Sequence, residues 1–287
     1  MNGPASNASA ETADYLERVR AGLRQIGKTD GDFENGKLGI RDLAAVDQFH
    51  VRGLAAIEDL IAACDVEPGA RIVDIGCGTG GPARALATGT GAYVTGYDLN
   101  PVSVEAGNQM SVWTGMSDRV ELHIGCATDL PADSGTFDGA WSVHVGMFVE
   151  DKAAFYAEAF RVLKPGGWLV VFDPVIAGGM DHSYPVPWAP DRATNYALTA
   201  DGLTDHLKAA GFIDVNMVDR TEAAMAWFAE QRAAREAANA KGRGYGPPPL
   251  GLHLLVGPRF GEMTMNAAKA LSEGKIGFAE LHARKPA

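Results

Sequence analysis

The residues best suited to chemistry lie in a glycine-rich stretch, VDIGCGTGGPAR, from Val73 to Arg84. Two ligand-binding patterns overlap in it. Glycines at 76, 78 and 81 match G-x-G-x-x-G, which is typical of dinucleotide sites. Gly76, Gly78 and Gly80 match G-x-G-x-G, which is typical of a different class of cofactor site. Both patterns let a ligand approach the backbone between a strand and a helix, so neighbouring residues must decide between them.

Asp74, two residues before the first glycine, favours the second pattern. A carboxylate at this position would lie near the pyrophosphate of a dinucleotide and repel it. The same carboxylate would attract a cofactor that carries an ammonium and a sulfonium group, and S-adenosylmethionine carries both. The acid therefore turns a weak glycine pattern into a more specific prediction of a methyl-donor site.

Two further carboxylates follow predicted strands and suit a bound nucleoside. Asp98 ends the second predicted strand, where an acid can accept hydrogen bonds from both ribose hydroxyls. Asp129 lies in GCATDLP, after the third predicted strand, where a carboxylate can accept the amino hydrogens of adenine. The alternative for Asp129 is a residue that caps the loop.

Methyl transfer from a sulfonium needs alignment of the nucleophile with the methyl group, and a base that removes one proton. Histidine is the usual base because its pKa lies near 7. His144 leads because it follows the fourth predicted strand, and ligands of open α/β sheets bind at the carboxyl ends of strands. His50, in DQFHVRG, is the second candidate. The alternative for each is a structural histidine.

The elements that must position these residues alternate between strands and helices, which indicates a doubly wound parallel sheet. Short apolar runs bounded by turn residues predict strands at residues 70–76, 92–98, 119–125, 137–143, 168–173, 215–219 and 276–283. KPGG, at Lys164–Gly167, is predicted to form a turn before the fifth strand. The first ten residues are small and polar, and we expect them to be disordered.

Two long segments, near residues 174–199 and 220–275, interrupt the rhythm and predict cap insertions. Together with residues that follow the fourth strand, they would supply an apolar pocket that favours an apolar or aromatic substrate over a zwitterionic amino acid. For any one of these residues the alternative is a place in the core of the cap. The candidate pocket residues are Met147, Phe148, Tyr184, Trp188 and His253.

Composition excludes several classes of protein. The net charge is −11, from 25 Lys and Arg against 36 Asp and Glu, which argues against a nucleic-acid partner. Three cysteines without C-x-x-C spacing favour neither a zinc site nor a disulfide framework. The N-terminus lacks a signal-peptide pattern, and no run of 18 apolar residues predicts a membrane span. We therefore expect a cytoplasmic protein with a small-molecule substrate, and the oligomeric state stays open.

From about Asp47 to the C-terminus the sequence resembles the class I S-adenosylmethionine-dependent methyltransferases. Four motifs carry the resemblance in order: VDIGCGTGG, TGYDLN, GCATDLPADSGTFDGAWS and RVLKPGGWLVVFD. It implies a Rossmann-like seven-stranded sheet with helices on both faces, an antiparallel last strand and a mostly helical cap. It also implies that Leu99 packs on adenine, that backbone near Ser142 holds the methionine end, and that Gln48 and His50 cover the cofactor. The other implied cofactor residues are Asp74, Gly76, Gly78, Gly80, Asp98 and Asp129.

A closer resemblance is to small-molecule methyltransferases of the sarcosine/dimethylglycine and prenyl C-methyltransferase type. It rests on DQFHVRG, GGPAR, WSVHVGMFVEDK and EGKIGFAELHARK. The related glycine-pathway enzymes often have an acid where this chain has His144, which puts glycine-type substrates in doubt. The resemblance implies an enzyme of secondary metabolism whose acceptor atom, carbon, nitrogen or oxygen, stays open.

Three alternatives remain at this level. A prenyl diphosphate C-methyltransferase would bring Mg²⁺ with its substrate and use Arg52, Arg192 or Arg259 for the phosphates, since no acidic cluster predicts a resident metal. An NAD-dependent oxidoreductase would need the dinucleotide pattern that Asp74 disfavours. The third alternative is a non-enzymatic protein that keeps the cofactor pocket but has lost catalysis.

The expected organisation has four parts. They are a disordered N-terminus (1–10), N-terminal helices over the cofactor site (11–66), a cofactor-binding core (67–173), and the rest of the sheet with the cap insertions (174–287).

Overall fold

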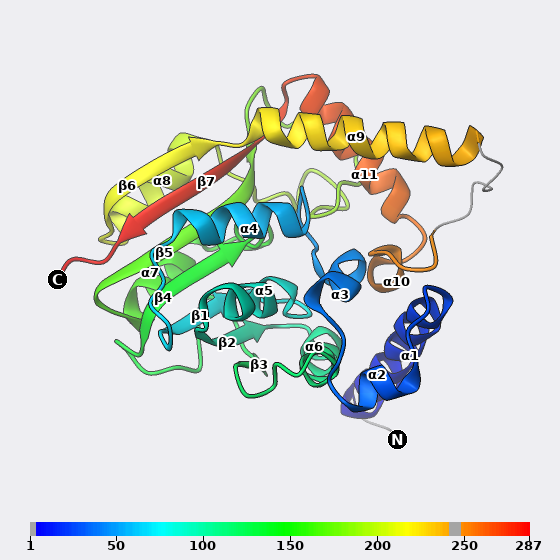
Figure 1. Ribbon diagram of the computed structural model, residues 1–287. Coiled ribbons are helices and arrows are strands. Elements are labelled where there is room, and N and C mark those ends of the chain that lie inside the picture. Colours follow the sequence, from blue (N-terminus) through cyan, green and yellow to red (C-terminus); the bar gives the residue numbers. More distant parts are fainter. Residues whose placement is uncertain (1–3, 241–247) are drawn as a thin grey trace.

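The described residues, 4–240 and 248–287 of a computed structural model, form one seven-stranded sheet flanked by helices (Figure 1). The strand order is β3-β2-β1-β4-β5-β7-β6, and β7 runs antiparallel to β5 and β6. The predicted α/β sheet with an antiparallel last strand is confirmed. The strands are β1 (Arg71–Ile75), β2 (Tyr93–Asp98), β3 (Val120–Ile124), β4 (Phe137–Val143), β5 (Leu163–Ile176), β6 (Ile213–Asp219) and β7 (Ile276–Arg284).

The central strands bring the predicted site residues to one edge of the sheet. β1 is buried from Ile72 to Ile75 and pairs in parallel with β2 and β4. Asp74 lies opposite Gly96 on one side and Trp141 on the other. Because the carboxyl ends of parallel strands meet at the same edge, Asp74, Asp98 and Ser142 all lie near that edge.

Strand β5 is longer than its apolar run. It begins at Leu163, which pairs with Phe137, whereas Trp168 pairs with Gly139, so the ladder shifts register across KPGG. The prediction of a turn at KPGG is therefore wrong, and the segment forms an irregularity within one strand. The N–H of Lys285 donates to the carbonyl of Gly167 at 2.8 Å, which ties this irregularity to the C-terminal segment.

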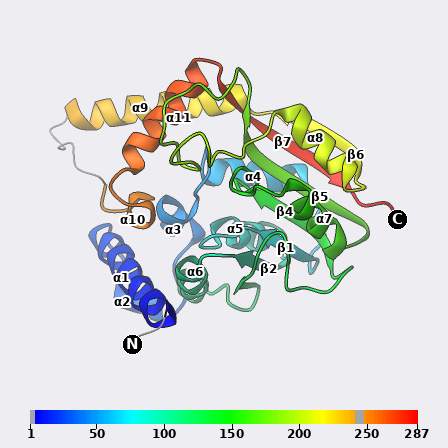
Figure 2. The ribbon, with the colours of Figure 1, turned by 180° about the vertical axis from the view of Figure 1, so that it is seen from behind.

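Helices cover both faces of the sheet, as predicted. One face packs against α4, α5, α9 and α11, and the other packs against α7 and α8 (Figures 1 and 2). Pro82 lies in the first turn of α5 and Pro101 begins α6, where a missing N–H costs little. The helices are α1 (Pro4–Gln25), α2 (Asp30–Glu34), α3 (Ile40–Asp47), α4 (Leu54–Ala63), α5 (Gly81–Thr90), α6 (Pro101–Trp113), η1 (Gly146–Phe148), α7 (Lys152–Val162), α8 (Ala200–Ala209), α9 (Thr221–Ala240), α10 (His253–Val256) and α11 (Phe260–Ser272).

The N-terminal segment differs from expectation. Residues 4–10 form the first turns of α1, so the prediction of disorder is wrong for them, and residues 1–3 lie outside the described part of the chain. Helix α1 packs its apolar face, with Tyr15, Val19 and Leu23, against residues of α6 and Leu250. The small polar residues alone would not form a stable helix. Packing of the apolar face of α1 stabilises it, because burial outweighs the local helix propensity.

The two insertions differ in character. Residues 177–199 have no helix or strand, but the side-chain amide of Asn266 donates to the Pro185 carbonyl and Lys275 pairs with Asp181. The second insertion consists mainly of α9 and α11, and α9 extends away from the sheet (Figure 1). Within residues 4–240 and 248–287, no helix is long and apolar enough to cross a membrane.

A buried ion pair joins the N-terminal helices to the sheet. Arg84, on α5, is fully buried, and its guanidinium lies 3.0 Å from the carboxylate of Asp47, the last residue of α3. Arg84 also donates to the carbonyls of Thr79, at 2.7 Å, and Gly107, at 3.0 Å. A buried charge with several partners is tolerated, whereas a buried charge that loses its partner is costly.

We expect Arg84→Met to lower the free energy of unfolding by about 3–5 kcal/mol, because Asp47 would stay buried without its cation. Urea denaturation measures the change. The matched control is Arg259→Met, which removes an exposed ion pair with Glu262 and should cost about 0–1 kcal/mol. Equal losses in the two variants would contradict the assigned role of the buried pair.

Candidate functional site

The glycine-rich loop between β1 and α5 is shaped for close approach. Gly76, Gly78 and Gly80 all have positive φ angles, of 78°, 52° and 73°. A Cβ at Gly81 would lie 2.0 Å from the carbonyl oxygen of Asp47, so the end of α3 rests directly on the start of α5. The end of α3 therefore closes one side of this loop, in which the N–H groups of Gly76 and Cys77 donate to the Tyr97 carbonyl and that of Gly80 donates to the Cys77 carbonyl.

Asp98 fastens the glycine loop to the end of β2. Its carboxylate accepts the N–H of Gly78 at 2.9 Å and the N–H of Asn100 at 2.8 Å. Leu99, the next residue, is 67 % exposed, which leaves its side chain open to a flat ligand. The structure thus brings Asp98, Leu99 and the glycine loop together, and their contact with a cofactor stays a prediction.

Asp74 is buried at the carboxyl end of β1 with unused hydrogen-bonding capacity. Only 1 % of its surface is exposed, and within the described residues its Oδ2 atom has no hydrogen-bond partner. Burial, together with the nearby charge of Asp98, raises the pKa of Asp74 to about 7. An acid held in this way is stabilised by any cation that enters the site.

Ser142 contributes a second unused group at the same edge. Its hydroxyl is buried, and in residues 4–240 and 248–287 it has no hydrogen-bond partner. Buried polar atoms without partners are rare in folded proteins and point to a missing ligand. Asp74 and Ser142 therefore fit a bound group that offers both positive charge and hydrogen bonds.

Asp129 is placed less clearly. It lies in the exposed loop between β3 and β4, where its N–H donates to the Cys126 carbonyl. It lines a shallow hollow with Tyr97, His123 and Arg161. Its contact with a nucleoside stays a prediction.

The two candidate histidines face one another although 94 positions separate them. The ring centroids of His50 and His144 lie 6.0 Å apart in an edge-to-face arrangement. The His144 ring stacks on Phe278, with centroids 5.6 Å apart and planes at 12°, and contacts Phe172 at 5.1 Å. Among the described residues, the buried Nε2 atom of His144 has no hydrogen-bond partner, so one ring nitrogen is open to a ligand.

Both imidazoles are uncharged at neutral pH. Burial lowers the pKa of His50 to about 4 and lowers that of His144 well below its ordinary value. The Nε2 atom of His50 lies 2.9 Å from the side-chain oxygen of Gln48, which is itself 2 % exposed. The structure differs here from the expectation of a base with a pKa near 7: these histidines can accept a proton, but only weakly.

The predicted pocket residues separate into two groups. Met147, Tyr184 and Trp188 belong to the same apolar cluster as Phe172 and Phe278. The side chain of Asn195 links two of them, because it accepts the Trp188 indole N–H and donates to the Tyr184 hydroxyl.

Phe148 and His253 are not gathered with them. Phe148 is 48 % exposed, on η1. His253 begins α10, which packs near α1, and burial lowers its pKa. Their assignment to the pocket stays a prediction without a contact that supports it.

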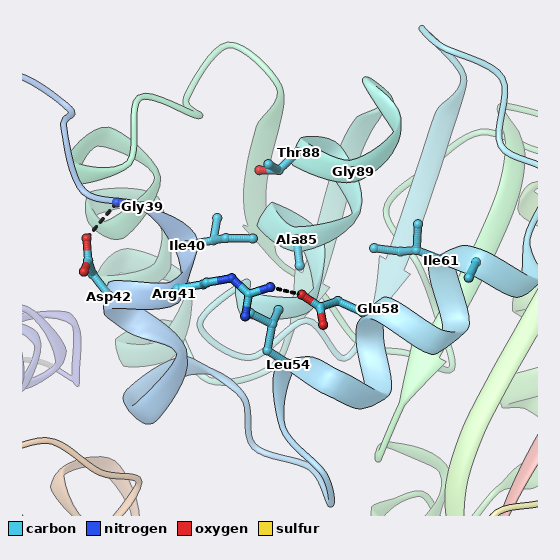
Figure 3. Close-up of a pocket in the computed structure, with 11 residues that line it drawn as sticks. Gly39, Ile40, Arg41, Asp42, Leu54, Glu58, Ile61, Ala85, Thr88 and Gly89 are labelled. Atoms are coloured by element: carbon cyan, nitrogen blue, oxygen red, sulfur yellow. Dashed lines mark hydrogen bonds and ion pairs between the residues drawn. The ribbon is translucent and has the colours of Figure 1, made fainter.

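A separate apolar groove lies on the outer side of the glycine-loop helix. Figure 3 shows it between α3, α4 and α5, lined by Ile40, Leu54 and Ile61 and crossed by the ion pair of Arg41 with Glu58. None of the predicted site residues lines it. The groove is therefore distinct from the candidate site at the carboxyl ends of the strands.

One buried acid near the site escaped the sequence analysis. Asp173 ends the predicted fifth strand, although β5 continues to Ile176, and it is 2 % exposed. The signal that identified Asp74, an acid at the carboxyl end of a buried strand, applies equally to Asp173. Within residues 4–240 and 248–287, no group of three or more metal-ligating side chains is present.

Comparisons with known proteins relate this chain to methyltransferases. Residues 73–171 match the family model of a methyltransferase domain. The methyltransferase GfsG of Streptomyces halstedii is 32 % identical over 174 residues, which cover 60 % of this chain and 61 % of that protein.

Two solved structures share the fold. The cyclase SpnF is 29 % identical, with a TM-score of 0.59 and 80 % of each chain covered. The geranyl diphosphate C-methyltransferase of Streptomyces coelicolor is 20 % identical, with a TM-score of 0.62 and with 80 % of this chain and 75 % of that one covered. The chain spans between 28 % and 61 % of the length of the first curated relatives that it matches.

The raised pKa of Asp74 predicts an unusual pH dependence. In the folded protein this acid stays protonated up to about pH 7, whereas in the unfolded chain it ionises near pH 4, so its contribution to stability is lost as pH rises through 7. Without ligand, Asp74→Asn should raise stability by about 2–3 kcal/mol more at pH 8 than at pH 5.

Chemical denaturation at the two pH values tests this. Asp138→Asn serves as the control, because Asp138 is ion-paired with Lys164 and its loss should destabilise the protein. A pH-independent effect of Asp74→Asn would contradict the assigned ionisation.

Proposed function

Because the chain belongs to the class I S-adenosylmethionine-dependent methyltransferases, we propose that it transfers a methyl group to a small, apolar or aromatic metabolite by in-line displacement. One observation carries the proposal. Asp74 is a buried carboxylate with an unpartnered oxygen among the described residues, beside a glycine loop and Asp98. This arrangement suits a cationic nucleoside and disfavours a pyrophosphate, so it argues against the NAD-dependent alternative.

The residues at the edge of the sheet would divide the binding of S-adenosylmethionine among them. Asp74 would hold the ammonium group, and backbone near Ser142 would hold the rest of the methionine end. Asp98 would accept the ribose hydroxyls, Leu99 would cover adenine, and Asp129 would accept its amino hydrogens. Gln48 and the glycine loop, with Gly76, Gly78 and Gly80, would close the site around the sulfur.

The chain itself would mainly position the reactants. When bound, S-adenosylmethionine supplies a methyl group that is already activated, so alignment and exclusion of water contribute most of the acceleration. His144, with its open Nε2 atom, would accept the proton that the acceptor releases, and His50 would face it. Because both imidazoles are weak bases, they suit an acceptor that is acidic or reacts without prior deprotonation, such as a phenol or an electron-rich carbon.

The walls around His144 favour an uncharged acceptor. Phe172 and Phe278 contact its ring, and burying an unpaired charge beside them would be costly. A prenyl diphosphate, the substrate class named for the structural neighbour from Streptomyces coelicolor, needs cations. Arg52 is already paired with Asp59 at 2.7 Å and Arg259 with Glu262 at 2.9 Å, and Arg192 is exposed, so we rank this Mg²⁺-dependent alternative second. A role in secondary metabolism and a cytoplasmic location belong to the same proposal.

The affinity for S-adenosylmethionine should rise with pH between 5.5 and 7.5. The ammonium group binds the ionised form of Asp74, and burial holds the pKa of this acid at about 7. We expect the affinity to fall about tenfold for each pH unit below 7, and Asp74→Asn to abolish the dependence. Isothermal titration calorimetry measures both. The control Asp138→Asn should bind like the wild type, and a wild-type protein that binds neither S-adenosylmethionine nor its demethylated product would refute the proposed function.

Loss of the proposed base should slow methyl transfer. Methyl-labelled S-adenosylmethionine, incubated with a metabolite extract, would first identify the acceptor by its label. With that acceptor at saturation, His144→Ala should lower kcat by about 10²–10⁴-fold. His206→Ala, in the last turn of α8 and outside the proposed site, is the matched control and should leave kcat unchanged. Unchanged turnover by His144→Ala would exclude it as the base.

A further inference from the structure

The backbone of His144 is held in an unfavourable conformation. Its φ angle is +57°, in the left-handed region that residues with side chains rarely adopt. Such a conformation is unfavourable and persists only where surrounding contacts impose it. The N–H of His144 donates to the Phe172 carbonyl at 2.7 Å, which holds the residue from the side of β5. A second contact must hold the residues that follow.

Asp173 supplies that contact. One carboxylate oxygen, Oδ1, accepts the N–H of Val145 at 2.9 Å. The other oxygen, Oδ2, lies 2.3 Å from where a Cβ of Gly146 would stand, so the backbone of Gly146 passes directly over the carboxylate. Only glycine permits this approach, although the φ angle of Gly146 is not positive. The acid therefore holds both residues immediately after His144.

The groups around Asp173 act on its carboxylate in opposite directions. Burial raises its pKa to about 7, while the N–H groups of Val145 and Gly146 and the charge of Lys152 oppose that rise. Lys152 is 6 % exposed, and its amine donates to the Val149 carbonyl, which closes the same turn at its other end. The Tyr156 hydroxyl lies 3.5 Å from the point that a Cβ of Gly146 would occupy. Asp173 and Lys152 thus bracket residues 145–149.

The two sides of this turn have different roles. Asp173 and Tyr156 lie on the side of α7, whereas the His144 ring lies on the opposite side, against Phe172 and Phe278. Asp173 is therefore separated from the reacting atoms of the proposed function. It acts on the site through the backbone of Val145 and Gly146.

We propose that Asp173 is a positioning residue, whose carboxylate holds the backbone of Val145 and Gly146 and thereby fixes His144 in the conformation that presents its imidazole between Phe278 and His50. The importance of this position for methyl transfer rests on the proposed function, but the geometry can be tested without turnover. The proposed roles of Asp74 and of the glycine loop do not depend on this role of Asp173.

Histidine-labelled NMR spectra test the proposal. The His144 signals are assigned by their loss in His144→Ala, and stacking on Phe278 gives them an upfield ring-current shift. We expect Asp173→Ala to lose this shift and to move the imidazole titration of His144, because the turn is released. Asp173→Asn keeps an oxygen for the Val145 N–H and should retain most of the shift. Asp138→Asn, which removes a carboxylate that accepts the N–H of Arg71 at the other edge of the sheet, should leave the His144 signals unchanged.

A second variant covers the case in which Asp173→Ala does not fold. Gly146→Ala keeps the acid but places a methyl group against it, so it should also displace His144 and lose the shift. Wild-type His144 signals in folded Asp173→Ala or in Gly146→Ala would overturn the proposal, as would an Asp173→Asn variant that loses the shift as completely as Asp173→Ala. These spectra do not depend on cofactor binding or turnover, so failure of the proposed methyl transfer would be recognised separately in the calorimetry and the labelling experiment.

Discussion

The buried cation Arg84 and its hydrogen-bond partners hold the N-terminal helices against the glycine loop. The guanidinium of Arg84 has no exposed surface, and it joins Asp47 at the end of α3, Thr79 in the glycine loop, and Gly107 and Ser111 on α6. A cation in such a place must keep all its partners, because losing one would leave charge buried without compensation. The pair therefore fixes α3 against Gly81, and the residues that follow α3, Gln48 and His50, take their places above the carboxyl ends of the strands.

The site built at that edge has two electrostatic halves. Asp74 and Asp98 lie at the ends of β1 and β2, where burial and mutual repulsion raise the pKa of Asp74 to about 7 and favour an incoming cation. His50 and His144 lie in the other half among Phe172 and Phe278, and burial lowers the pKa of both imidazoles. A cationic cofactor and an apolar acceptor would each find a suitable half, and β4, which lies between β1 and β5, contributes residues to both.

The segment after β4 shows how contacts with a neighbouring strand can fix the position of one side chain, that of His144. Its backbone follows an unfavourable path at His144 and passes over Asp173 at Gly146. Two hydrogen bonds join this segment to β5: the Phe172 carbonyl accepts the N–H of His144, and the Asp173 carboxylate accepts the N–H of Val145. Preorganisation of this kind lowers the entropy that must be lost when a reactant is aligned.

The sequence by itself located the seven strands and predicted the edge of the sheet at which a cofactor would bind. Apolar runs between turn residues located all seven strands, and Asp74 and Asp98 were found because an acid at the end of a buried strand is a local pattern. Tertiary structure decided the features that depend on contacts between distant residues. Residues 4–10 are helical because α1 packs on α6, and KPGG lies within β5 because its neighbours pair on both sides. His50 meets His144, and Asp47 meets Arg84, only after the chain has folded. The lowered pKa values of His50 and His144 follow from burial, which depends on contacts between residues far apart in the sequence.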